Sequence, residues 1–226
     1  MASIADNYRR IRQTIPDHVT LVAAGKTRTA AEVAEAIEAG ITVVGHNYVQ
    51  EAEAMIAELG DRARWHLIGH LQKNKAKKAV PVFDMIETVD SWDLAEVIER
   101  RCELLEKTMP VLIEVNSGRE PNKTGVLPEE VDELVKRVAS LPHLRVEGLM
   151  TMGPRFGDPE DARPYFRATK EAFDRLAEAG IPGAPGAPGA EMRILSMGMS
   201  NSYEVAIEEG STMVRIGTKL FGERED

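Results

Sequence analysis

Lys26 is the residue of this sequence whose type and position most clearly could do chemistry. It follows a short apolar stretch, residues 19–24, with the composition of a buried β-strand. Side chains alternate along a strand, so Val22, Ala24 and Lys26 are expected on one face. A lysine on the inward face of a barrel would be partly desolvated and would act as a nucleophile toward carbonyl groups. The alternative is a solvated lysine in a loop, which its position alone slightly favours.

Two segments near the end of the chain have the composition of a phosphate site. The first is Ser-Met-Gly-Met-Ser-Asn-Ser, residues 196–202, and the second is Arg-Ile-Gly-Thr, residues 215–218. The first follows the seventh predicted strand and the second closes the eighth, and barrels often hold a phosphate after these two strands with backbone N–H groups. Ser200, Gly217 and Thr218 are the candidate phosphate ligands. Helix capping by Ser200 or Ser202, with a tight turn at Gly217, is the alternative interpretation.

Arg215 is expected to point into the same barrel mouth, because strand alternation puts it on one face with Met213 and Gly217. It could pair with a phosphate or donate to a ring nitrogen of a bound ligand. The alternative is an ion pair with a barrel carboxylate such as Glu114, since a buried arginine needs a partner.

Two further segments place polar residues near the ends of strands. Asn47 follows the second predicted strand and is either a rim residue or the cap of the next helix. His66 and His70 are four residues apart, a spacing that suits zinc only on a helix. They span a strand and a turn instead, so no metal site is expected.

The elements that must position these residues alternate between β-type and helical stretches, a pattern typical of βα units around a parallel sheet. Strands are predicted at residues 19–24, 42–44, 65–68, 85–89, 110–115, 145–150, 193–195 and 212–216. Helices are predicted at residues 29–39, 49–59, 92–107, 128–140, 160–179 and 202–209, with a short one beginning at 74–78. A doubly wound open sheet usually has fewer strands. The sequence therefore predicts a single (β/α)8 TIM barrel.

Composition restricts the class of protein further. A chain of 226 residues suits one barrel domain, residues 1–226, in which the Pro/Gly-rich residues 180–190 are a loop insertion. The net charge of −9 argues against a nucleic-acid surface. One cysteine, no signal-peptide pattern and no stretch long enough to span a membrane favour the cytoplasm.

Six segments together resemble the pyridoxal phosphate homeostasis protein family. They are residues 21–27, 45–51, 65–75, 148–152, 196–200 and 213–218, in order and across nearly the whole chain. The resemblance implies a barrel of the alanine racemase N-terminal type that carries pyridoxal 5′-phosphate (PLP) as a Schiff base on Lys26. It also implies that Ser200, Gly217 and Thr218 hold the phosphate, with Arg215 near the pyridine nitrogen and Asn47 beside the ring.

The resemblance further implies a protein that buffers PLP or delivers it to apo-enzymes, and a monomer is expected. The alternative is a single-domain PLP-dependent racemase, but such racemases take a second base from another domain, and this chain ends shortly after strand eight. The chain also departs from the family, which usually has serine where Gly25 stands and glutamate where His46 stands. These two positions affect the contacts around the ring.

Overall fold

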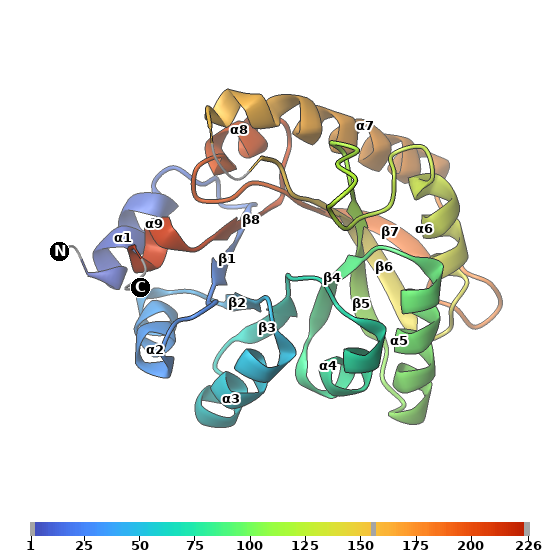
Figure 1. Cartoon of the computed structure of the whole chain (residues 1–226), viewed down its shortest axis with the longest axis horizontal. Helices are drawn as coiled ribbons and strands as arrows, with labels where there is room; N and C mark the ends of the chain where they lie inside the picture. Colours follow the sequence, from blue (N-terminus) through green and yellow to red (C-terminus); the bar gives the residue numbers. More distant parts are fainter. Residues whose placement is uncertain (1–2, 155–156, 224–226) are drawn as a thin grey trace.

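The computed structural model describes residues 3–154 and 157–223 and contains a closed barrel of eight parallel strands with helices around it (Figure 1). The strands are β1 (Thr20–Ala24), β2 (Val43–His46), β3 (Arg64–Leu67), β4 (Met85–Val89), β5 (Met109–Val115), β6 (Leu144–Thr151), β7 (Ala190–Ser196) and β8 (Met213–Ile216). The helices that follow β1 to β7 are α2 (Ala30–Ala39), α3 (Val49–Leu59), α4 (Ala76–Val82), α5 (Trp92–Leu104), α6 (Val131–Ala139), α7 (Arg163–Ala179) and α8 (Tyr203–Glu208). The predicted (β/α)8 barrel is confirmed.

Some boundaries differ from the predicted ones for local reasons. Helix α6 begins later than expected because residues 128–130 form a turn, in which Glu130 N donates to Leu127 O at 2.9 Å. The segments before α4 and α7 are 3-10 turns, η1 (Lys73–Lys75) and η2 (Pro159–Ala162). Strand β7 starts at Ala190, which forms an antiparallel bridge with Ile181 across the Pro/Gly-rich loop.

Two helices outside the repeating βα units lie together where the barrel closes. They are α1 (Ile4–Arg12) and α9 (Thr218–Phe221), and Figure 1 shows them next to each other at the two ends of the chain. Asn7 Nδ2 donates to Leu220 O at 2.9 Å, and the Arg28 guanidinium donates to Gly222 O. These bonds fix the backbone that follows β8 against α1 and against the loop that follows β1.

The loop containing Lys26 is held at both ends. It starts where β1 ends at Ala24 and stops at a capping box that opens α2. In that box Thr29 N donates to Glu32 at 2.8 Å, and Glu32 N donates back to the Thr29 hydroxyl at 3.2 Å. Such reciprocal bonds satisfy helix N–H groups that would otherwise lack partners.

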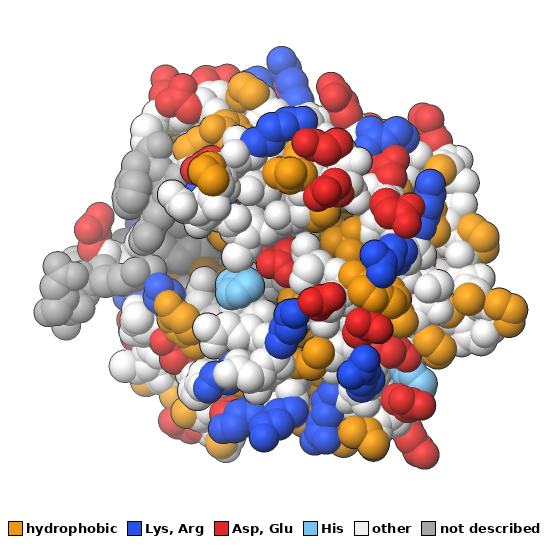
Figure 2. All heavy atoms as spheres, turned by 45° about the vertical axis from the view of Figure 1, so that its right-hand side comes forward, with side chains coloured by type: hydrophobic (Ala, Val, Ile, Leu, Met, Phe, Trp, Pro, Cys, Tyr) orange, Lys and Arg blue, Asp and Glu red, His pale blue; other side chains and the backbone are white. Residues whose placement is uncertain are grey.

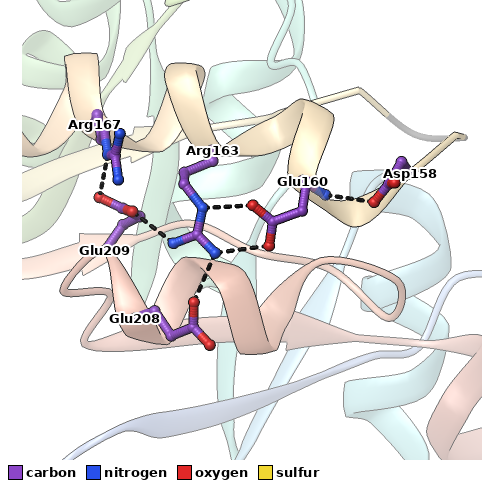
Figure 3. Close-up of polar contacts among 6 residues, drawn as sticks. All are labelled: Asp158, Glu160, Arg163, Arg167, Glu208 and Glu209. Carbon is purple, nitrogen blue, oxygen red and sulfur yellow. Dashed lines mark hydrogen bonds and ion pairs between the residues drawn. The ribbon is translucent and has the colours of Figure 1, made fainter.

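A network of ion pairs fastens α8 to the start of α7 (Figure 3). Arg163 contacts Glu160, Glu208 and Glu209, each at 2.7 Å, and Arg167 also contacts Glu209 at 3.0 Å. The side chain of Asp158 accepts from Glu160 N at 3.0 Å. Because α8 directly follows residues 196–202, the network also restrains that loop.

The surface agrees with the composition. Figure 2 shows acidic and basic side chains intermixed over most of the visible face. Within the parts of the chain that the structure describes, no helix combines the length and apolar character that a membrane span requires.

Gly148 lies at an irregularity in the pairing of β5 with β6. The β5–β6 register passes from the pair Val111 and Val146 to the pair Leu112 and Gly148, so one residue of β6 is extra, as in a β-bulge. Gly148 has φ +152°, and a Cβ there would lie 1.8 Å from Ile194 O in β7. Only glycine allows β6 and β7 to approach this closely.

We therefore expect Gly148→Ala to lower the free energy of unfolding by more than about 3 kcal/mol, because the clash is with backbone. Gly60→Ala is the matched control: its φ is +62° but a Cβ there meets nothing within 4 Å. That control should lose only about 1–2 kcal/mol. Equal losses in urea denaturation of the two variants would contradict the proposed role of this contact.

Candidate functional site

The candidate site lies where the first strand of the barrel meets the last. Strands β1 and β8 pair in parallel, with Val22 opposite Arg215 and Ala23 opposite Ile216. One step further along both strands, Ala24 comes within 3.5 Å of a Cβ built on Gly217. Residues almost two hundred positions apart in the chain are therefore neighbours at the carboxyl-end rim, where barrel enzymes bind their ligands.

Lys26 stands at this seam in a tight turn. Arg28 N donates to Gly25 O at 3.1 Å, and Thr27 has φ +64°, an unfavourable conformation for a β-branched residue. The Lys26 side chain is half-buried, and its Nζ lies 5.2 Å from the centroid of the Tyr48 ring. The amine is thus directed across the rim toward the loop after β2, and not into open solvent.

The predicted phosphate ligands come together opposite this turn. Ser200 Oγ accepts from Gly217 N at 3.2 Å and from Lys219 N at 3.4 Å. Thr218 is exposed and is the first residue of α9. These long bonds to one hydroxyl leave two backbone donors that a phosphate oxygen can share, so the residues fit a phosphate.

The capping alternative for Ser200 is wrong, since the residue that precedes α8 is Ser202. Even Ser202 makes no side-chain capping bond with that helix, and its hydroxyl accepts from Met199 N at 3.3 Å instead. Asn47 is likewise not a helix cap, because Tyr48 occupies that position before α3. Asn47 is half-buried, and no hydrogen bond links its side chain to another described residue.

Arg215 points into the barrel, as strand alternation predicted, and is only 4% exposed. Its guanidinium donates to Ser196 Oγ at 2.6 Å and to Thr151 O at 2.9 Å. Ser196 Oγ in turn donates to Glu87 at 2.7 Å. The alternative interpretation, a direct ion pair with Glu114, is thus not what the structure has: Arg215 pairs indirectly with Glu87 through a serine hydroxyl.

Glu87 is fully buried and receives two hydrogen bonds, one from Ser196 and one at 2.8 Å from His66 Nδ1. Burial alone would raise its pKa, but the bond to His66 and the nearby charges of His66 and Arg215 hold the pKa below its usual value. Glu87 is thus the anion that compensates the buried guanidinium.

Sequence reasoning missed Glu87, Ser196 and Thr151 as parts of the site and considered His66 only as a metal ligand. One signal was present: Glu87 lies in the middle of Met-Ile-Glu-Thr-Val, a stretch otherwise suited to a buried strand. A charge at such a position requires a partner.

Among the described residues, no cluster of three or more histidine, cysteine or acidic side chains could hold a metal ion.

Glu114 has a different environment from Glu87. Thr124 donates to its Oε1 at 2.8 Å, but its buried Oε2 has no hydrogen-bond partner in the part of the chain described. Burial, with a smaller contribution from the charge of Asp90, raises the pKa of Glu114 to about 7.

Gly25 and His46, the two departures from the family pattern, contact each other. A Cβ on Gly25 would lie 3.2 Å from His46 Cε1, so the imidazole occupies the space that a side chain at position 25 would enter. The His46 ring is fully buried, stacks on Trp65 with centroids 6.0 Å apart, and has no hydrogen-bond partner at either nitrogen among the described residues. Burial lowers its pKa to about 4.

These two buried groups predict opposite pH dependences of stability. As pH falls from 6.5 to 4, unfolded His46 takes up a proton that the folded state refuses, so stability decreases, by up to about 3 kcal/mol. Glu114 acts in reverse: its raised pKa means that stability decreases as pH rises from 4.5 to 7. We expect His46→Gln to remove the first slope and Glu114→Gln the second.

Urea denaturation of the three proteins between pH 4 and 8 measures these slopes. In the wild-type protein the two pH dependences of stability partly cancel. Each variant should keep only one of them, so the stability of His46→Gln and that of Glu114→Gln should change with pH in opposite directions. Variants whose profiles keep the wild-type shape would show that the two groups titrate normally.

Comparison with known proteins identifies the family. The family model described as the alanine racemase N-terminal domain matches residues 1–225. The pyridoxal phosphate homeostasis protein of Aquifex aeolicus is 43% identical over 206 residues, which cover 91% of this chain and 87% of that protein. The Escherichia coli K12 protein of the same name is 38% identical over 100% of this chain and 98% of its own.

Among solved structures, PipY of Synechococcus elongatus, determined with PLP bound, superimposes with a TM-score of 0.86 at 35% identity. The match covers 97% of this chain and 100% of PipY. With sequence, fold and the rim segments in agreement, the chain belongs to the pyridoxal phosphate homeostasis protein family and carries the alanine racemase N-terminal domain over residues 1–225.

Proposed function

We propose that this protein binds PLP covalently on Lys26 and takes part in PLP homeostasis by buffering or delivering the cofactor. The observation that carries the proposal is the meeting, at the β1–β8 seam, of a half-buried lysine and a set of backbone donors suited to a phosphate. The homologue PipY, solved with PLP bound, supports the choice of ligand.

Each residue at the rim has a role in this proposal. PLP, when bound, supplies an aldehyde that combines reversibly with amines. The Lys26 amine holds that group, and its turn keeps the amine at the seam. Ser200, Gly217 and Thr218 hold the phosphate, which gains charge-assisted hydrogen bonds from hydroxyl and backbone N–H groups. Asn47 lies beside the ring.

We assign Arg215 to the ring nitrogen and not to the phosphate. Its guanidinium is held inside the barrel between Ser196 and Thr151, whereas the phosphate donors belong to residues 217–219 on the rim. A guanidinium that cannot give up its proton leaves the ring nitrogen as an acceptor, and this weakens the ring as an electron sink. A carrier needs no such sink.

The geometry of Tyr48, the tyrosine beside Lys26, also favours a carrier over a racemase. A racemase needs a second base aimed at the substrate, but Lys26 Nζ lies over the ring face of Tyr48, which is 51% exposed. Reversible binding needs only an accessible rim.

We further propose that residues 1–226 act as one domain, in which residues 180–190 are an inserted loop. In this proposal the protein works in the cytoplasm as a monomer and supplies PLP to apo PLP-dependent enzymes.

The phosphate assignment predicts how affinity depends on Ser200. PLP should bind far more tightly than pyridoxal, which lacks the phosphate. Ser200→Ala should weaken PLP binding by about 10- to 100-fold, because a hydrogen bond to a charged group contributes about 1.5–3 kcal/mol. Binding of pyridoxal should be unchanged. Absorbance titration of the purified protein measures both affinities.

Ser140→Ala is the matched control, since Ser140 is the residue that ends α6 and its hydroxyl donates to Arg137 O, far from the loops of the proposed phosphate site in sequence. It should bind both ligands as the wild-type protein does. If Ser200→Ala binds PLP with undiminished affinity, the phosphate lies elsewhere.

A further inference from the structure

A second pocket lies on the rim beside the proposed cofactor site. It has a volume of about 290 Å³ and lies between the loop after β2 and the loop after β3. Its polar lining comes from Asn47, Tyr48, Gln50, His70, Gln72 and Lys75. All six belong to the two sequence segments, residues 45–51 and 65–75, that resemble the family but have no role in holding a phosphate. The size is near the lower end for small-molecule sites.

The walls of this pocket are fixed by backbone contacts. A Cβ on Gly69 would lie 2.5 Å from Asn47 O, so the two loops touch at a position that only glycine permits. Ile68 N donates to His46 O at 2.9 Å, and Thr88 Oγ1 donates to Gly69 O at 2.8 Å inside the protein. The pocket is therefore preformed, which reduces the entropy that a ligand loses on binding.

Four of the hydrogen-bonding side chains around the pocket have no partner in the part of the chain that the structure describes. No described residue forms a hydrogen bond or ion pair with the side chains of Asn47, Gln50, Gln72 or Lys75. The neighbouring lysines differ: Lys73 pairs with Asp93 at 2.6 Å, and Lys78 with Glu53 at 3.9 Å. Lys75, by contrast, is half-buried, lines the pocket and has no counter-ion in the described structure.

The charge of the residues that line the pocket favours an anionic ligand. The lining contains one lysine and no carboxylate, although the whole chain has a net charge of −9. Asp90 faces His70 Nδ1 at 3.6 Å but is not part of the lining. One ammonium and three side-chain amides offer donors to a single anionic group.

We propose that this pocket binds the carboxylate of a small molecule, either a simple organic acid or an amino acid. Lys75 supplies the charge, and Asn47, Gln50 and Gln72 supply amide donors. Tyr48 borders both this pocket and Lys26, so the ligand lies next to the proposed cofactor site. The inference does not depend on the cofactor, because every group it uses belongs to the chain itself.

The test uses the full-length protein without PLP, labelled with ¹⁵N, and follows the side-chain amides of Asn47, Gln50 and Gln72 by NMR. Propionate should shift them to saturation, whereas propionamide, which has the same shape without the charge, should not do so at equal concentration. Lys75→Met should weaken propionate binding about tenfold. Lys77→Met is the matched control, because Lys77 is exposed two residues further on, in α4, and does not line the pocket.

Alanine, titrated in parallel, distinguishes the two ligand sources. Tighter binding than propionate identifies an amino acid, and weaker binding identifies a simple acid. The proposal is overturned if propionamide binds as well as propionate, if Lys77→Met loses as much affinity as Lys75→Met, or if inorganic phosphate binds these amides more tightly than either carboxylate. A protein that bound carboxylates here but did not bind PLP would refute only the proposed function.

Discussion

Parallel pairing of β1 with β8 is the constraint on which the whole site depends. It closes the barrel and thereby brings the turn containing Lys26 beside Gly217, at the other end of the sequence. The surrounding contacts reinforce the closure: α1 bonds to α9, and Arg28 holds the backbone after α9. To bind one molecule, the amine that takes the aldehyde and the donors that take the phosphate must lie at a fixed distance from each other. The β1–β8 pairing that closes the barrel sets this distance.

Beneath this rim, the barrel interior contains a buried charge network instead of a purely apolar core. Arg215, Ser196, Glu87 and His66 form one chain of hydrogen bonds in which cation and anion never touch directly. Removing one partner of a buried ion pair typically costs about 3–5 kcal/mol because the other charge remains. Removing either the cation or the anion of this network should therefore destabilise the protein. What the intact network provides is an arginine held in one orientation toward the barrel mouth.

Much of this architecture was predictable because it follows from local rules. Alternation of apolar stretches and helices gave the barrel, and strand alternation placed Arg215 inside it. The network around Arg215 was not predictable, because its members come from β3, β4, β6 and β7, and their register across the barrel is a tertiary property. The contact of Gly25 with His46 was hidden for the same reason, although both residues stood out as departures from the family.

The most direct test of the central claim is to load the protein with PLP, reduce it with borohydride and map the labelled peptide. The proposed site predicts one pyridoxyl group on Lys26, and loss of the visible absorbance band of the bound cofactor in Lys26→Ala. Recovery of the label mainly on Lys73, Lys75 or another lysine would contradict the account.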